Sequence, residues 1–156
     1  MPEFKDKVSH HVELLFITSA NATLAFNSVK DWIDLYKKNE QATPTTAILD
    51  VKDIIFFERF KRSGKKNFKK WLRKELSMLE KMLIEKNEKY GNSALKPLRI
   101  FSSSDSVEQI NVRMDDKLSR IYNQKDTDDE DAELDFLGYF ILREIALTCP
   151  SSLFYR

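Results

Sequence analysis

The chain has few of the residues that bridge, bend or interrupt a fold. Its 156 residues include one cysteine, two histidines, three glycines and four prolines. The single Cys149 excludes an internal disulfide and suits a reducing compartment, so we expect a cytoplasmic location. His10 and His11 both lie near the N-terminus, which excludes a histidine-rich zinc site or a catalytic histidine in the later motifs. The scarcity of glycine and proline favours helix.

A strong charge of one sign and a long apolar run are also missing. The net charge is +1, so no overall field favours nucleic acid or a membrane surface. No apolar run is as long as a membrane span, and no secretory signal is visible. With 42% apolar and 33% charged residues, the composition is typical of a soluble globular protein, and the length fits a single domain over residues 1–156.

Apolar side chains recur at three- and four-residue steps, which predicts an all-α bundle of about five helices. The predicted helices cover residues 12–36, 48–60, 67–89, 105–122 and 128–147. Residues 1–11 are predicted to be frayed, and residues 12–17 would also fit a short strand. After Leu134 the last helix is apolar almost all round, so we expect it to be the central, most buried helix. Gly91 is expected to end the third helix, and Asp105 to begin the fourth with a capping box.

Two acids near the start of the last helix, Asp131 and Asp135, lie one turn apart on the same face. Asp135 is next to Leu134 and Phe136, and a carboxylate so deep in an apolar helix requires a cation or a metal as its partner. Two carboxylates at this spacing make a half-site for Mg²⁺, which prefers oxygen ligands. An Arg or Lys partner is the alternative that the spacing leaves open. We expect both carboxylates to face inward and to lie near the basic side chains of the preceding helix, at residues 107–122. Three other acids of the run, Asp126, Asp129 and Glu130, are expected to form a solvated cap.

The preceding helix carries Arg113, Lys117 and Arg120 on one face. Guanidinium forks and ammonium groups suit phosphate oxygens. The alternative is a solvated face on which Asp116 pairs with Arg120 at i, i+4. The carboxylate pair follows these basic residues within a short stretch of chain. A site that combines basic side chains, carboxylates and Mg²⁺ is suited to the phosphates of a nucleotide.

One acid of the longest predicted helix, Glu75, falls inside its apolar stripe. It therefore requires a buried partner, such as Lys86 of another layer or a basic residue elsewhere, or it serves as a metal ligand from a second helix.

Eight Lys and Arg residues crowd positions 61–74, with Phe68 and Trp71 between them. A basic cluster with interleaved aromatic residues can bind nucleic acid. Both aromatic residues fall on the apolar stripe, however, so no stacking platform remains. We interpret the segment as a solvated helix face, with contact to nucleic acid as the alternative.

Three short signatures follow one another in the second half of the chain. They are Lys-x-Glu-x-Tyr-Gly-Asn-Ser at 86–93, Arg-x-x-Asp-Lys-x-x-Arg at 113–120 and Asp-x-x-x-Asp-x-x-Gly-Tyr at 131–139. In order and spacing they resemble the type 1 nucleotide-modification-associated domain, a family common in phages and prophages that is similar to the MazG-like all-α nucleotide pyrophosphohydrolases. Two positions depart from the family. Glu88 stands where the first motif usually has Asp, and only Glu85-x-x-Glu88 approximates the double-Glu motif of MazG enzymes.

The resemblance implies a MazG-like, nucleotide-binding helical core in residues 63–150, with residues 1–62 as an N-terminal helical extension whose role it does not name. It also implies an acid-lined Mg²⁺ site and a nucleotide, including a modified one, as substrate or ligand. By position it implies metal binding by Asp131 and Asp135, catalysis by Glu88 and Asp116, and nucleotide contacts by Lys86, Tyr90, Asn92, Arg113, Lys117 and Arg120.

The leading hypothesis is a Mg²⁺-dependent nucleotide pyrophosphohydrolase-like enzyme of the cytoplasm, or of the host cytoplasm if a phage encodes it, in which a metal-bound water attacks phosphorus. One alternative is a non-catalytic module that binds or sequesters nucleotides during nucleic-acid modification. A second is a helical nucleic-acid-binding protein that uses residues 61–74. We also expect a homo-oligomer, because MazG-like bundles often assemble and the helices carry more apolar surface than one small bundle needs. Residues 1–60 are the expected place for that contact.

Overall fold

Six α-helices make up most of the chain in this computed structural model, which describes residues 3–22, 26–39, 43–123 and 131–148. No β-strand occurs in those ranges, so the all-α prediction is confirmed. The helices are α1 (Phe4–Ala20), α2 (Val29–Asn39), α3 (Pro44–Ser63), α4 (Phe68–Tyr90), α5 (Ser106–Asn123) and α6 (Ala132–Thr148). None of these helices is both long enough and apolar enough to cross a membrane.

The N-terminal part differs from the sequence prediction in two ways. The segment predicted to be frayed is helical from Phe4 onward, because Val8 is fully buried in the core. The single helix predicted over residues 12–36 is two helices, which raises the number from about five to six. The second of them begins after Ser28, whose hydroxyl accepts a hydrogen bond from the N–H of Asp31 at 3.0 Å. A side-chain cap of this kind starts a new helix without any glycine or proline.

Helix ends elsewhere follow the local chemistry of the sequence. Gly91 ends α4 in the left-handed conformation with φ 64°, as predicted, and Gly64 ends α3 in the same way with φ 72°. Glycine adopts this conformation at little steric cost. The carboxylate of Asp105 accepts the N–H of Glu108 at 2.8 Å, which is the N-cap half of the predicted capping box.

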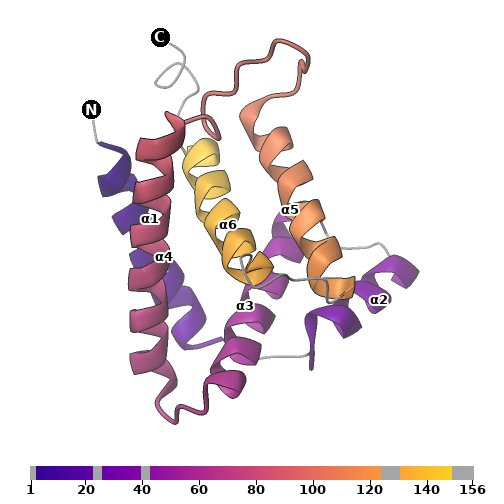
Figure 1. Cartoon of the computed structure of the whole chain (residues 1–156). Coiled ribbons are helices and arrows are strands. Elements are labelled where there is room, and N and C mark those ends of the chain that lie inside the picture. The colour runs from indigo at the N-terminus through magenta and orange to yellow at the C-terminus, as the bar shows by residue number, and fades with distance from the viewer. Residues whose placement is uncertain (1–2, 23–25, 40–42, 124–130, 149–156) are drawn as a thin grey trace.

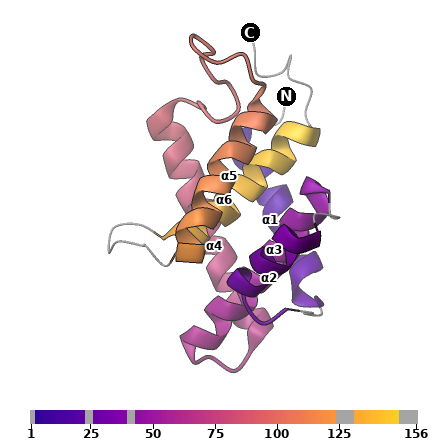
Figure 2. The same ribbon diagram turned by 90° about the vertical axis from the view of Figure 1, so that its right-hand side faces the viewer.

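Helix α6 is the centre of the bundle, as its nearly all-apolar sequence predicted. Ten of its 17 residues are buried, and it packs against α1, α3, α4 and α5 (Figure 1). The core is continuous with the N-terminal helices, since Leu15 of α1 and Phe56 of α3 are buried in the same cluster. Turned by 90°, the molecule shows α5 and α6 side by side, with α2 and α3 beneath them (Figure 2). The last turns of α4 and α6 and the first turn of α5 lie at the same end of the bundle (Figure 1).

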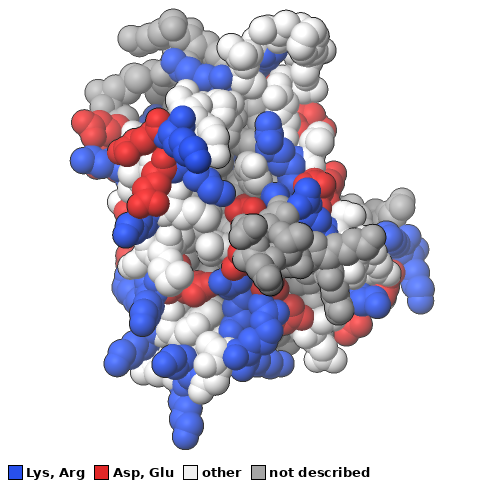
Figure 3. Space-filling model, viewed as in Figure 1, with Lys and Arg blue, Asp and Glu red and all other residues white. Residues whose placement is uncertain are grey.

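The basic segment 61–74 lies at the turn between α3 and α4. Its Lys and Arg side chains are exposed and gather at the lower end of the molecule (Figure 3). Phe68 and Trp71 are half-buried, and Phe68 stacks on Phe57 of α3 with ring centroids 4.5 Å apart. The two aromatic residues thus pack inward, as their place on the apolar stripe predicted.

Candidate functional site

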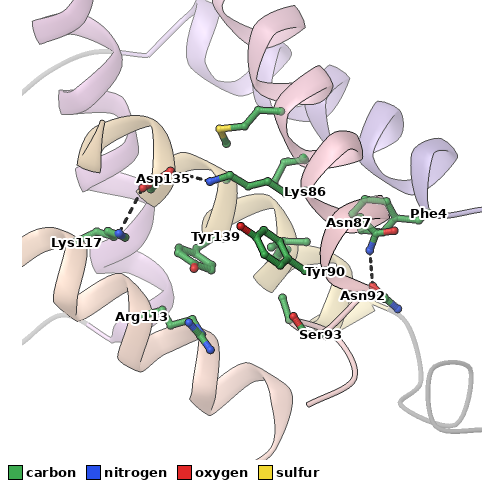
Figure 4. Close-up of a pocket in the computed structure, with 15 residues that line it drawn as sticks. Phe4, Lys86, Asn87, Tyr90, Asn92, Ser93, Arg113, Lys117, Asp135 and Tyr139 are labelled. Carbon is green, nitrogen blue, oxygen red and sulfur yellow. Dashed lines mark hydrogen bonds and ion pairs between the residues drawn. The ribbon is translucent and has the colours of Figure 1, made fainter. Parts of the chain in front are cut away.

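A cavity of about 370 Å³ lies between α4, α5 and α6. We call it the basic cavity (Figure 4). Its volume falls within the usual range for small-molecule sites, roughly 300–1,000 Å³. Its polar lining consists of Lys86, Asn87, Tyr90, Asn92, Ser93, Arg113, Lys117, Asp135 and Tyr139. Each of the three sequence signatures contributes to this list, so the fold brings together segments that are far apart in the chain.

Each signature provides two lining residues one helical turn apart. These i, i+4 pairs are Lys86 and Tyr90 on α4, Arg113 and Lys117 on α5, and Asp135 and Tyr139 on α6. Residues at this spacing project from the same face of a helix. The helix α6 packs between α4 and α5, so the three faces converge on one space.

The charged end of the basic cavity is formed around Asp135. Its carboxylate oxygens lie 3.3 Å from the ammonium nitrogens of Lys86 and Lys117. The side chains of Asp135 and Lys117 are 17% and 14% exposed, so this contact is shielded from water and is screened little by salt. Arg113 also lines the cavity and forms no ion pair with any residue in the described ranges. Three cations and one carboxylate leave this end with a net charge of +2.

The opposite end of the cavity is neutral and rich in amide groups. Asn87 donates from Nδ2 to Oδ1 of Asn92 at 2.8 Å, and Ser93 and Phe4 lie beside them. Figure 4 shows Tyr90 between this end and the charged end. The basic cavity therefore has one end suited to an anion and another suited to a flat polar group with hydrogen-bonding edges.

The wall between α4 and α6 depends on Gly138. A Cβ atom added to it would lie 3.1 Å from Cε of Met82 and 3.2 Å from Cδ2 of Leu83. These contacts are tighter than ordinary van der Waals separation, so a side chain at position 138 would require the ends of the Met82 and Leu83 side chains to shift.

Four residues that the resemblance placed in the site do not line the basic cavity. Glu88 is exposed on the last turn of α4. Asp116 and Arg120 pair with each other at 3.2 Å on α5, which is the i, i+4 alternative that the sequence left open. Asp131 lies at the start of α6, where its Oδ1 accepts the N–H of Leu134 at 3.0 Å. It caps the helix.

Asp131 also takes part in a separate ion cluster that joins α3, α4 and α6. Arg59 donates from Nη1 to Oδ2 of Asp131 at 2.9 Å and from Nε to Oε1 of Glu75 at 2.6 Å. Glu133 binds both Arg59 and Arg62. Burial alone would lower the pKa of Arg59, but the charges of Asp131 and Glu75 outweigh it and raise that pKa above its ordinary value. Arg59 is thus fixed as a cation.

Sequence reasoning found part of this cluster. It predicted that Glu75 requires a buried partner, either Lys86 or a basic residue elsewhere; Arg59 is that partner, and Lys86 pairs with Asp135. It also expected Asp131 and Asp135 near the basic residues of the α5 helix. This holds for Asp135 and is wrong for Asp131, whose ion-pair partner comes from α3. Arg59 follows the buried Ile55 by four residues and so lies on a buried face of α3. This spacing is the sequence signal that could have identified Arg59 as a buried cation.

The two aspartates predicted as a Mg²⁺ half-site have different partners. Asp131 pairs with Arg59, and Asp135 pairs with two lysines. Within the described ranges, no group of three or more Asp, Glu, His or Cys side chains is arranged to hold a metal ion. The acids of residues 126–130 lie outside those ranges. The described donor set therefore does not form a Mg²⁺ site made by protein groups alone.

A larger cavity of about 680 Å³ lies between α2, α3 and α5, and we call it the acidic cavity. Its floor is apolar and includes Trp32 and Phe136, and its lining includes Glu108 and Asp115. Burial, together with the charge of Glu108, raises the pKa of Asp115. Among the described residues of its lining, two acids outnumber the single cation, Lys37, which makes this cavity unfavourable for a phosphate.

Comparison of the chain with protein-family models, with curated proteins and with solved structures finds no match. The case for a function therefore depends on the residues and on their arrangement.

Proposed function

We propose that this protein binds a nucleotide in the basic cavity, with phosphate at the charged end and the base at the amide end. The observation that carries the proposal is the convergence of the three signatures on one cavity that is cationic at one end only. Lys and Arg side chains are the groups that bind phosphate oxygens. Lys117 is shielded from water, and Lys86 and Arg113 are exposed at the same end of the cavity. Asn side chains and an aromatic ring suit the edge and face of a base.

Mg²⁺ enters the proposal as a companion of the nucleotide. The ion is commonly bound by one or two carboxylates together with substrate phosphates. In the basic cavity Asp135 is the described carboxylate that would contribute. A bound divalent ion would offset the repulsion between Asp135 and a polyphosphate. Asp131 has no part in this arrangement, because Arg59 and the α6 N-terminus occupy its carboxylate.

Binding is the function that these contacts support best. The resemblance to MazG-like pyrophosphohydrolases also suggests hydrolysis. We propose as well that residues 63–150 form a MazG-like core. Among the described residues, however, Asp135 is the single carboxylate that lines the basic cavity, and the expected catalytic acids Glu88 and Asp116 lie outside it. We therefore propose a nucleotide-binding module and treat turnover as a separate question for experiment.

The test is a thermal-shift panel of nucleoside mono-, di- and triphosphates, each with and without Mg²⁺. A ligand that binds the native state raises apparent stability by about 2.7 kcal/mol at one hundred times its Kd. We expect at least one nucleotide to raise the melting temperature, and Lys117→Ala to weaken its binding by roughly tenfold to a hundredfold, the value of a charge-assisted hydrogen bond.

Lys69→Ala is the matched control, because Lys69 is exposed on α4 in the 61–74 segment, and we expect it to bind like the unchanged protein. Phosphate or pyrophosphate release from any bound nucleotide then separates an enzyme from a binding module. The absence of a shift with every nucleotide, with and without Mg²⁺, would show that the proposal is wrong.

A further inference from the structure

A third cavity adjoins the basic cavity beside α5. It measures about 470 Å³, and we call it the serine cavity. Its lining consists of Ser102, Ser104, Gln109, Val112, Arg113, Asp116, Lys117 and Tyr139. Three of these residues, Arg113, Lys117 and Tyr139, also line the basic cavity. The two cavities therefore meet at the same two cations.

The wall of the serine cavity is held in place by local hydrogen bonds. Gln109 donates from Nε2 to the carbonyl oxygen of Ser104 at 2.8 Å, which ties the segment before α5 to the helix. The N–H of Ser104 donates to the hydroxyl of Ser102 at 3.3 Å. The carboxylate of Asp116 is paired with Arg120 at 3.2 Å, so its repulsion of an anion is reduced. The cavity thus offers hydroxyl and amide groups beside a shared cationic junction.

The position of the cations decides what kind of ligand fits both cavities. A nucleotide with a terminal phosphate would occupy the basic cavity and end at Arg113 and Lys117, leaving the serine cavity unused. A ligand that fills both cavities has its phosphate in the middle and a polar unit on each side. We infer that the site takes a nucleotide whose phosphate is esterified to a second polar unit, either a second nucleoside or a sugar. This inference rests on the proposed function.

The chemistry of the serine cavity indicates how the second unit is held. Hydroxyl, amide and carboxylate groups bind the hydroxyls of a ribose or a hexose through hydrogen bonds. Val112 is the sole aliphatic residue among the described residues of the lining, so hydrogen bonds and not apolar burial would hold the second unit. We expect the second unit to raise affinity by about tenfold, the equivalent of one or two net hydrogen bonds.

Isothermal titration of the full chain tests this with two pairs of ligands. The first pair is a dinucleoside monophosphate and the methyl ester of the corresponding nucleoside 5′-phosphate, measured for each of the four bases. The second pair is a nucleoside diphosphate hexose and the methyl ester of the same diphosphate. Within each pair the charge is equal, and only the second unit differs. We expect one of the two-unit ligands to bind about tenfold more tightly than its methyl ester.

Variants at Ser102, Ser103 and Ser104, the serine run that precedes α5, show whether the second unit binds in the serine cavity. Ser102→Ala combined with Ser104→Ala should reduce the advantage of the two-unit ligand to about threefold or less, the loss expected for two hydroxyl contacts, and leave the affinity of the methyl ester unchanged. Ser103→Ala is the matched control, since Ser103 belongs to the same run and does not line the cavity.

Equal affinity of each two-unit ligand and its methyl ester would overturn the inference and leave the proposed function standing. No binding by any of these ligands or by a simple nucleotide would overturn both. An advantage that survives the double serine substitution would show that the second unit lies elsewhere.

Discussion

Asp135 lies between two lysines that an incoming phosphate would also contact. Its carboxylate and the phosphate compete for Lys86 and Lys117, since both lie 3.3 Å from Asp135. The carboxylate therefore orders the two ammonium groups and weakens phosphate binding at the same time. A divalent ion that bridges Asp135 and the phosphate would remove this competition.

Replacing Asp135 by Asn keeps the side-chain shape and removes its charge. We expect Asp135→Asn to bind a nucleotide about tenfold more tightly without Mg²⁺, because one repulsive charge at close range is worth about 1 kcal/mol or more in a shielded site. We also expect the variant to gain little from added Mg²⁺. Titration calorimetry in EDTA and in Mg²⁺ measures both effects. Glu85→Gln, an exposed acid on α4, is the control. Loss of binding under both conditions would show that Asp135 contacts the ligand in another way.

Arg59 forms ion pairs with three carboxylates, those of Glu75, Asp131 and Glu133, and its own side chain is only 16% exposed. Arg59→Ala should lower the free energy of unfolding by about 3–5 kcal/mol, because it leaves the shielded carboxylate of Glu75, 11% exposed, without the partner that Arg59 provides. Denaturant unfolding measures this change. Arg73→Ala removes a much more exposed pair with Glu13 and should cost about 1 kcal/mol. Equal losses in the two variants would contradict the role that we give to Arg59.

At the scale of the element, the end of α4 connects helix geometry to the site. Gly91 and Asn92 both have positive φ, 64° and 65°, and the N–H of Asn92 bonds to the carbonyl of Asn87 at 3.3 Å. This turn places the side chain of Asn92 against that of Asn87 at the amide end of the basic cavity. The left-handed turn of the first signature is therefore part of the site as well as a helix stop.

Two glycines allow a matched test of this turn. Gly91→Ala and Gly64→Ala each place a Cβ in open space at positive φ, so each should cost about 1 kcal/mol of unfolding free energy. Only Gly91→Ala should also weaken nucleotide binding, because only Gly91 adjoins the cavity lining. Denaturant unfolding and titration calorimetry of both variants separate the two effects. A similar loss of binding in both variants would assign it to lowered stability alone.

The sequence predicted the elements from α3 to α6 within a few residues, because their apolar stripes and their caps agree. It missed the break between α1 and α2, since no glycine or proline lies there and the signal is one serine, Ser28. At the site, i, i+4 spacing correctly grouped Arg113 with Lys117 on one cavity face. Spacing along a helix gives the face of a side chain and not its partner across the bundle. For that reason the cation that pairs with Asp131 could not be predicted.

At the scale of the whole molecule, assembly stays a prediction. Leu14 and Ile17 lie one turn apart on α1, are 44% and 54% exposed, and belong to the N-terminal part in which we expected an oligomer contact. We expect a mass above that of one chain by light scattering at micromolar concentration, and a return to the monomer mass in Ile17→Asp, because a charge in an apolar contact is costly. A monomer mass for the unchanged protein would count against the prediction.

The central claim is that one nucleotide contacts three segments that are distant in the sequence and adjacent in the fold. The most direct measurement is a nucleotide titration of ¹⁵N-labelled protein followed by backbone amide chemical shifts. We expect the largest changes to fall together in residues 86–93, 113–117 and 135–139, the segments that line the basic cavity. Changes concentrated in residues 61–74 or around the acidic cavity, with these three segments unaffected, would contradict the claim.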